Sequence, residues 1–269
     1  MFKNIINAIK AYFGSFKLMS KLGLWKYFGI PILISFVIGW CYLLMIYFLS
    51  STLGALISKI WIWEWGAQTF ATISTYLGGL IIFAVGLILY KHIVMALSSP
   101  FMSPVSEKIE KYLLGEEDYV PQQASFTKQL ARSIRVNARN LFRELLFLIP
   151  LLILSLIPVV GIVGTILIFV IQAYYVGFGN MDYTMERHFN YKDSVRFVRK
   201  HRGTAIGNGL IFVFMLFIPI LGLIITLPIA VVAASTETVK LLKAEGFLKI
   251  EHTKKELLDV EEQPKLEQS

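Results

Sequence analysis

The sequence carries one unusual pattern twice, a Pro-x-x-Gly step inside a long apolar run. Residues 156–163 read "LIPVVGIV" and residues 217–224 read "FIPILGLI". Proline removes a backbone N–H and glycine tolerates turn conformations, so each block predicts a bend near the middle of an apolar segment. The length of the arms and the charge around them decide whether each bend is a kink or a hairpin.

The composition indicates an integral membrane protein. Of 269 residues, 56% are hydrophobic and 16% are charged, whereas a soluble domain holds about 25% charged residues. The apolar runs are also too long for a globular core. The net charge of +8 comes from basic residues that flank apolar runs, so we expect membrane lipids and no nucleic acid as partners.

The sequence shows no sign of an enzyme. Its four histidines lack the spacing of metal ligands, and one cysteine cannot build a thiolate site. Phosphate-binding glycine motifs are also missing from the sequence. We therefore expect no catalytic residues, no cofactor and no metal site.

Two apolar runs are long enough to cross a membrane. Residues 30–49 are twenty residues without a charge, and residues 69–97 form a second, longer run. Lys91 and His92 near its end are expected to snorkel or to emerge from the membrane. The residues between the runs, 50–67, form a loop with three tryptophans that suit a headgroup boundary.

Amphipathic helices surround these spans. Residues 2–16 predict a helix lying in the membrane interface, because apolar residues recur at spacings of three and four. Pro100 and Phe101 are predicted to end the second span, and a short helix follows from Ser103 to Gly115. That helix carries Glu107 and Glu110, which either meet basic residues in a vestibule or lie on a solvated face.

A helix predicted over residues 125–145 carries a basic stripe. The stripe shares one arc of about 80° and suits an anionic membrane surface. It consists of Lys128, Arg132, Arg135, Arg139 and Arg143.

Lysine and arginine counts predict the topology. Segments 1–29, 99–144, 179–207 and 235–269 hold five, seven, six and six of them, and the tryptophan loop holds one. Because positive charge marks the cytoplasmic side, the N-terminus and the tail are expected inside. Each Pro-x-x-Gly block must then leave and return on the same side.

The arms of the second block are short. Residues 208–219 and 222–234 reach only ~18–20 Å as helices, against a hydrocarbon core of about 30 Å. This favours a re-entrant hairpin with Pro219 and Gly222 at its tip. Pro158 and Gly161 would form the tip of a deeper hairpin or of a thin pair of spans. The alternative is that each block is one kinked span, and for the second block this places the tail outside, against the charge rule.

Several blocks resemble the CysZ sulfate-permease family and its wider etoposide-induced-protein superfamily. The resemblance runs over residues 10–240, and no single block is specific without the others. In order, the blocks are "LGLWKYFGIPILI" (22–34), "LSSPFMSPVSEKIE" (97–110), "LIPVVG" (156–161), "MDYTMERH" (181–188) and "FIPILGLIITLPIAVVAAS" (217–235).

The resemblance implies an all-α integral membrane protein with two full transmembrane helices, two hemi-penetrating helical hairpins and amphipathic interfacial helices. Residues 1–240 would form one membrane domain, and residues 241–269 a charged, partly disordered cytoplasmic tail. A homo-oligomer in the bacterial inner membrane would carry sulfate into the cell for cysteine synthesis. The alternative is a protein of the same superfamily that shapes or scaffolds the membrane without transport.

The resemblance also implies an anion site at the turn before the first span. The family's Gly-Leu turn and basic pair correspond to Gly23, Leu24, Trp25 and Lys26. Tryptophan stands at the first basic position, so only Lys26 remains to meet an anion. The alternative role of Lys26 is to anchor the helix end at the membrane surface.

The remaining candidates lie around the first hairpin. The four arginines of the stripe would draw anions to a pore mouth or bind lipid headgroups. Asp182 is expected to form a structural ion pair with Arg187 or with an arginine of the stripe. Tyr183 and His188 complete the set, and His188 is a candidate pH sensor.

Overall fold

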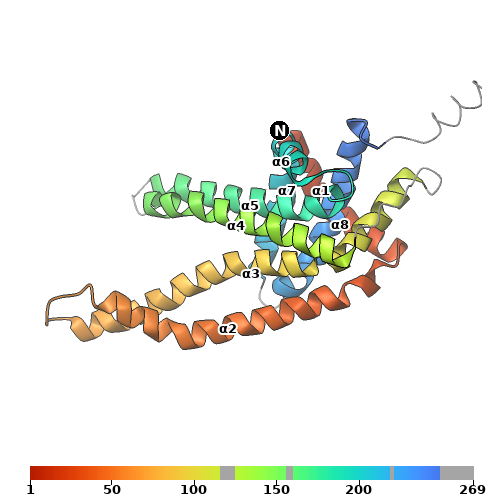
Figure 1. Ribbon diagram of the computed structural model, residues 1–269. Helices are drawn as coiled ribbons and strands as arrows, with labels where there is room; N and C mark the ends of the chain where they lie inside the picture. The colour runs from red at the N-terminus through yellow and green to blue at the C-terminus, as the bar shows by residue number, and fades with distance from the viewer. Residues whose placement is uncertain (116–124, 156–159, 219–220, 249–269) are drawn as a thin grey trace, which may run out of the picture.

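The computed structural model in Figure 1 describes residues 1–115, 125–155, 160–218 and 221–248, and within these ranges it contains helices and no strand. The elements are α1 (Phe2–Lys21), the 3-10 helix η1 (Leu24–Tyr27), α2 (Gly29–Ser58), α3 (Ala67–Leu114), α4 (Phe126–Ser155), α5 (Val160–Met185), α6 (Tyr191–Lys200), α7 (Arg202–Leu216) and α8 (Leu221–Ala244).

Helices α2 and α3 form a long hairpin that carries the two predicted spans. Helix α2 continues to Ser58, so the predicted loop over 50–67 is wrong in length and shrinks to residues 59–66. The reason is that residues 50–58 contain no proline to stop the helix. Trp61 stacks on Phe70 at this tip, with ring centroids 4.9 Å apart.

Helix α3 runs without interruption through Pro100 and Pro104, so the predicted break at Pro100 and Phe101 is wrong. An interior proline removes one backbone hydrogen bond, and a helix in a membrane protein absorbs that loss by bending beside neighbouring serines. Ser99 and Ser103 are buried here, and α3 turns away from the line of α2 in its last part (Figure 1).

Each Pro-x-x-Gly block joins two helices that lie along each other, α4 with α5 and α7 with α8. Pro158 and Pro219 lie outside the described residues. A Cβ atom on Gly161 would lie 2.4 Å from the carbonyl oxygen of Ser155, and one on Gly222 would lie 1.9 Å from that of Met215. The glycines therefore let the chain fold back closely on the preceding helix.

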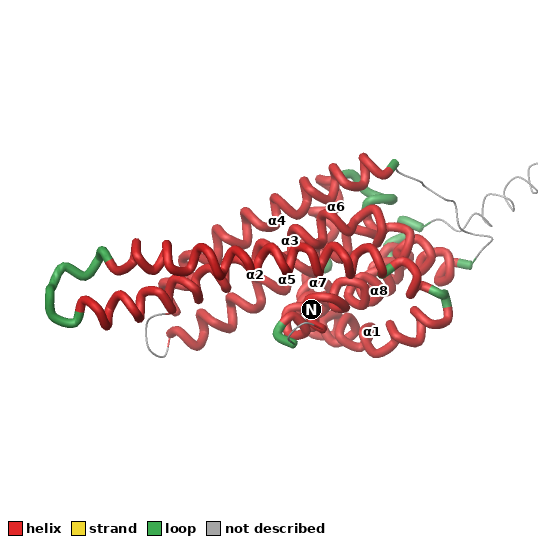
Figure 2. Tube along the Cα trace, turned by 90° about the horizontal axis from the view of Figure 1, so that it is seen from below, coloured by secondary structure: helices red, strands yellow, loops and turns green. Residues whose placement is uncertain are grey.

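In the part of the chain that the structure describes, four helices are long and apolar enough to cross a membrane. These segments are Gly29–Ser58, Ala67–Leu114, Val160–Met185 and Ile225–Ala244. The α4–α5 hairpin points in the same direction as α2–α3 and ends short of it (Figures 1 and 2).

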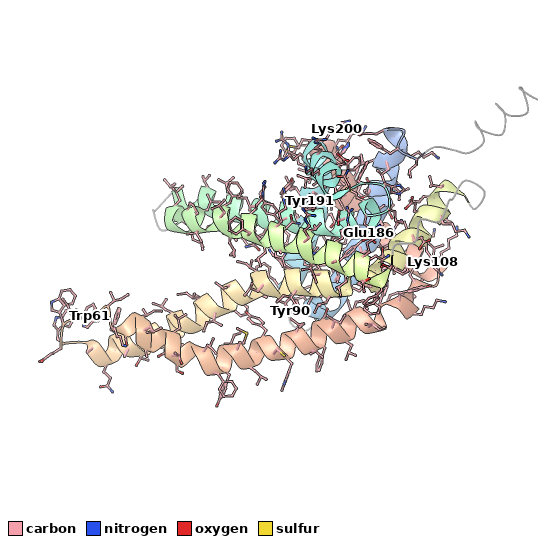
Figure 3. All side chains as sticks on the ribbon, in the orientation of Figure 1. Trp61, Tyr90, Lys108, Glu186, Tyr191 and Lys200 are labelled. Atoms are coloured by element: carbon pink, nitrogen blue, oxygen red, sulfur yellow. The ribbon has the colours of Figure 1, made fainter. Side chains whose placement is uncertain are left out.

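The main apolar core lies chiefly between α3 and α8, with contributions from α1, α5 and α7. Asn208 of α7 connects α1, α5, α7 and α8: its side chain accepts from Asn180 at 2.8 Å and donates to the carbonyl of Ala230 at 3.0 Å, and its carbonyl accepts from Tyr12 at 2.7 Å. Trp61 and the basic segments lie at opposite ends of the molecule, as the positions of Lys108 and Lys200 in Figure 3 show.

Candidate functional site

Helix α4 turns a polar stripe inward and an apolar surface outward. Its buried residues at spacings of four, three and four are Ser133, Asn137, Asn140 and Glu144, none more than 4% exposed. By contrast, Ile134, Phe142 and Leu146 are 48%, 68% and 57% exposed. Lipid around the helix explains this inverted amphipathic pattern, because polar groups in a membrane protein face the bundle interior or a polar cavity.

Opposite this stripe, α3 contributes two buried cationic or titratable groups. The Lys91 ammonium lies 2.5 Å from one carboxylate oxygen of Glu144, and His92 Nε2 lies 2.8 Å from the other. Asn137 Oδ1 lies 3.3 Å from His92 Nδ1, and Gln172 of α5 accepts from Lys91 at 3.4 Å. Lys91 and His92 are each 2% exposed, so the prediction that they snorkel or emerge is wrong.

This buried cluster is fully paired on its acidic side. Both oxygens of Glu144 are engaged, and the two partners are consecutive residues of one helix. A buried ion pair requires such geometry, because an uncompensated charge in a low-dielectric interior is strongly unfavourable. The cluster therefore fixes α4 against α3 at one register.

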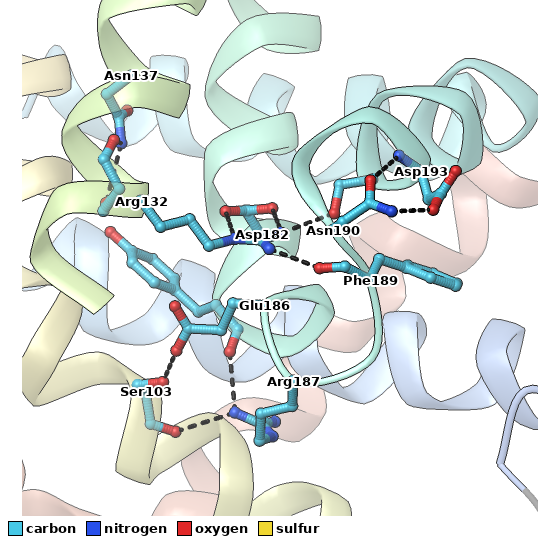
Figure 4. A network of polar contacts seen from close by, with 12 residues as sticks. Ser103, Arg132, Asn137, Asp182, Glu186, Arg187, Phe189, Asn190 and Asp193 are labelled. Atoms are coloured by element: carbon cyan, nitrogen blue, oxygen red, sulfur yellow. Dashed lines mark hydrogen bonds and ion pairs between the residues drawn. The ribbon is translucent and has the colours of Figure 1, made fainter. Parts of the chain in front are cut away.

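A second polar network lies at the end of α5 (Figure 4). Arg132 binds Asp182 with two nitrogens, Nη2 to Oδ1 at 2.9 Å and Nε to Oδ2 at 3.1 Å. Its Nη2 also donates to Ser194 Oγ at 2.7 Å. Arg132 belongs to the basic stripe, so the structure places Asp182 against one of the two expected partners. This contact joins α4, α5 and α6.

Glu110 of α3 pairs with two further basic residues of this region, Arg187 and His188. Arg187 Nη2 lies 2.7 Å from one of its oxygens, and His188 Nε2 lies 2.7 Å from the other. Arg187 also donates to Ser106 Oγ at 2.6 Å. Tyr183 is buried and donates to the carbonyl of Met95 at 2.6 Å, which secures α5 to α3.

Glu186 lies between these two ion pairs and contacts the hydroxyl of Ser103 (Figure 4). Burial raises the pKa of Glu186 to about 8, and the nearby Asp182 carboxylate adds to this effect. Arg187 and Arg132 oppose it. Glu186 therefore holds a proton near neutral pH.

The basic stripe contacts protein over much of its length. The Arg135 guanidinium lies 4.5 Å from the ring centroid of Tyr191, and that of Arg139 lies 5.2 Å from the ring of Phe178. Burial and the neighbouring Arg143 lower the pKa of Arg139. Arg132 is bound to Asp182 and Arg139 is partly buried, whereas Lys128 and Arg135 are exposed. A role of the exposed part of the stripe toward lipid headgroups or anions stays a prediction.

The turn before α2 has the shape that its glycine permits. Gly23 has a φ of 61°, in the left-handed region, and Leu24 after it is fully buried. Lys26 is exposed, with its ammonium 5.5 Å from the ring centroid of Tyr27, and Lys108 lies over the same ring at 5.1 Å. The turn thus presents the Lys26 side chain outward.

The remaining predicted residues, Pro100, Phe101 and Glu107, are buried or partly buried in the protein. Pro100 is buried, and the Phe101 ring meets Phe126 edge-on at 5.9 Å, which connects α3 to the start of α4. Glu107 is partly buried, whereas Glu110 is fully involved in the network. Within the described ranges, no group of three His, Cys, Asp or Glu residues could hold a metal ion.

Sequence reasoning missed the buried cluster of Lys91, His92 and Glu144, together with the inner stripe of α4. The signal for the stripe was present, since Ser133, Asn137, Asn140 and Glu144 recur at helical spacing. Nothing local identified the partner of Lys91, which lies 53 residues further along the chain.

Residues 11–226 match the family described as Sulfate transporter CysZ/Etoposide-induced protein 2.4. The chain belongs to this family. Among curated members, the chain is similar to "Sulfate transporter CysZ" of Pseudomonas fluorescens (strain Pf-5), with 31% identity over 144 residues, 52% of this chain and 56% of that relative. "Sulfate transporter CysZ" of Pseudomonas aeruginosa (strain LESB58) is 28% identical over 144 residues, 52% of this chain and 57% of the relative. The matched stretch therefore spans little more than half of each CysZ relative.

Proposed function

We propose that the chain moves sulfate, or a similar small inorganic anion, across a bacterial inner membrane and so supplies cysteine synthesis. The observation that carries the proposal is the inverted pattern of α4, whose polar stripe faces the bundle while its apolar side chains face outward. A helix that only anchors or shapes a membrane has no need of a buried Asn, Asn and Glu series. The names of the CysZ relatives supply the substrate.

In this proposal, basic groups guide the anion from the cytoplasmic end inward. Lys26 and the turn at Gly23 meet it at the membrane surface, through the Lys26 ammonium and the backbone of the turn. Arg132 and Lys91, each paired with a carboxylate in this structure, continue the polar lining along the inner face of α4. The two hairpins, with Gly161 and Gly222 beside their turns, close the pathway at mid-depth.

The α4–α5 hairpin enters the membrane only part of the way. Its outward-facing apolar side chains occupy about ten residues of each arm, roughly 146–155 and 160–169. Ten helical residues span ~15 Å, about half of a ~30 Å hydrocarbon core. The α2–α3 hairpin, whose helices carry exposed apolar side chains over much greater length, crosses completely.

The topology and assembly follow from the same arrangement. The basic segments share the end opposite Trp61, so that end is cytoplasmic, together with the N-terminus and the tail. Residues 249–269 of the tail lie outside the described part of the chain. Hairpins that end within the membrane leave polar backbone at their tips, which a homo-oligomer would enclose.

Uptake of radiolabelled sulfate into proteoliposomes tests the proposal. We expect uptake above empty vesicles, competition by sulfite, and a severalfold reduction in Lys26→Gln. Lys59→Gln, an exposed lysine at the opposite end of the molecule, is the matched control and should transport normally. A folded protein that gives no uptake above empty vesicles would refute transport.

The alternative is a protein that shapes or scaffolds the membrane. It is favoured by α1, where Phe2 and Phe13 are 81% and 83% exposed and would wedge into one leaflet. Vesicles that deform on addition of the protein, without sulfate uptake, would support this reading. In that case Phe13→Ser should abolish the deformation.

A further inference from the structure

Helix α1 has three distinct faces. One is buried against α7 and α8. The second is exposed and apolar, and it includes Phe13 and Phe16, which are 83% and 50% exposed. The third is basic, because lysines recur at spacings of seven, seven and four: Lys3, Lys10, Lys17 and Lys21. An exposed apolar face beside a lysine face is the pattern of a helix lying at the headgroup level of a bilayer.

The basic face of α1 borders a cavity of about 680 Å³ that α8 and the end of α3 complete. This volume is within the range of small-molecule sites in proteins, roughly 300–1,000 Å³. We call it the lysine cavity, after the four lysines in its lining: Lys10, Lys17, Lys21 and Lys240. Glu237 is the one acidic residue among its described lining residues, so the lining has a formal surplus of three positive charges.

Two of the four lysines are held by protein groups, and two are available. Lys21 donates to the Tyr112 hydroxyl at 2.7 Å, and Lys240 lies 2.7 Å from a carboxylate oxygen of Glu237. Lys10 and Lys17 are exposed and make no side-chain hydrogen bond or ion pair with the described part of the chain. Two unpaired ammonium groups and two oriented ones in one cavity form a site for a multiply charged oxyanion.

We propose that the lysine cavity binds the phosphate headgroup of an anionic phospholipid. Free phosphate offers the same chemistry to the lysines, but the adjoining apolar face of α1 favours a lipid. A headgroup in the cavity allows its acyl chains to lie along Phe13 and Phe16, which are otherwise exposed without a partner surface. The site differs from the anion-conducting route, which runs along the inner face of α4.

Gly14 lines the lysine cavity and leaves space there because it has no side chain. It lies on α1 between Lys10 and Lys17 and lines the cavity, and a Cβ atom there would meet nothing within 4 Å. A larger side chain at this position therefore fits the fold and occupies the cavity instead. Replacing a helix-interior glycine also favours the helix itself.

The experiment measures the thermal stabilisation of the purified full-length protein in detergent. Dioctanoyl phosphatidylglycerol is titrated, with dioctanoyl phosphatidylcholine and inorganic phosphate in parallel. We expect a saturable rise in Tm with phosphatidylglycerol and a much smaller one with the other two. Lys10→Gln/Lys17→Gln should weaken the apparent affinity roughly 25-fold, since each lysine near an anionic lipid contributes about 1 kcal/mol.

The control variant is Lys59→Gln/Lys192→Gln, which removes two exposed lysines outside the cavity and has the same net charge as the cavity variant. It should bind phosphatidylglycerol like the wild type. Gly14→Leu should retain or raise the Tm without lipid and should lose the lipid-induced rise.

Three results would overturn the proposal. If phosphatidylcholine raised the Tm as much as phosphatidylglycerol does, the negative charge of the lipid would have no role in binding. Equal loss of affinity in the cavity and control variants would reduce the effect to general surface electrostatics. Stabilisation by inorganic phosphate that matches phosphatidylglycerol, and that Gly14→Leu abolishes, would assign the cavity to a soluble anion.

Discussion

Helices α2 and α4 each have 30 residues, yet they present opposite surfaces to the bundle. In α2 the few buried residues are mostly small or apolar, and large apolar side chains cover the rest of its surface. In α4 the inner face carries serine, asparagine and glutamate beside the buried Val136 and Leu148, and its exposed apolar side chains resemble those of α2. The difference shows that in lipid the buried side chains, and not the exposed ones, separate an anchoring helix from one that lines a polar interior.

The largest expected effect comes from removing the acid at the centre of the inner face. Glu144→Ala leaves the buried Lys91 ammonium and His92 without their partner, so the unfolding free energy in detergent should fall by about 3–5 kcal/mol. Lys91→Met combined with Glu144→Leu removes both charges and should recover much of that loss. A loss below about 1 kcal/mol in Glu144→Ala would contradict the pairing.

The bidentate contact of α4 with α5 should contribute less. Asp182→Asn removes the charge that holds Arg132, and we expect a loss of about 2 kcal/mol by the same unfolding measurement. The matched control is Asp193→Asn, whose ion pair with Arg196 involves side chains 41% and 80% exposed. That control should change stability by less than about 0.5 kcal/mol, and similar losses in both variants would speak against a special role for Arg132.

Glu186 should make stability depend on pH. Its pKa in the folded protein is about 8, against an ordinary value of 4.5, so the folded state binds the proton more tightly. The stabilisation is complete below pH 4.5 and is lost as the pH rises to about 8. Relative to Glu186→Gln, the wild type should lose about 2 kcal/mol between pH 6 and 8. If the unfolding free energies of the wild type and Glu186→Gln changed with pH in parallel, Glu186 would have an ordinary pKa in the folded protein.

The smallest effects are expected on the outward surfaces. Leu33→Ala on α2 and Phe142→Leu on α4 change side chains that are 60% and 68% exposed. Both should alter the unfolding free energy by no more than about 0.5 kcal/mol. A large loss of unfolding free energy at Phe142 alone would mean that the outer face of α4 contacts protein, for example a second copy of the chain. The outer faces of α2 and α4 would then differ as well.

The sequence predicts the apolar framework better than the polar interior. The runs 30–49 and 69–97 lie in helices, and both Pro-x-x-Gly blocks join pairs of helices that lie side by side. The break at Pro100 is wrong because proline is treated locally as a helix terminator, whereas α3 continues through it. Hairpin depth stays a prediction, since it depends on the bilayer.

The sequence could predict an ion pair of the candidate site only where it offered few possible partners. Asp182 had two expected partners, and the structure places it against Arg132. The predicted exposure of Lys91 and His92 was wrong, because a long charged side chain near the end of an apolar run usually reaches the water at the membrane surface. Their burial depends on Glu144, which an isolated helix cannot reveal.

The inner face of α4 also has a consequence for how the protein is made. A helix leaving the ribosome partitions into lipid by its own side chains, and Glu144 stands directly before the apolar end of α4, where a charge next to the hydrocarbon opposes insertion. Because α3 is synthesised before α4, Lys91 and His92 already stand in position when Glu144 arrives. The order of synthesis therefore matches the order of assembly, and the first hairpin acts as the template on which the second enters the membrane.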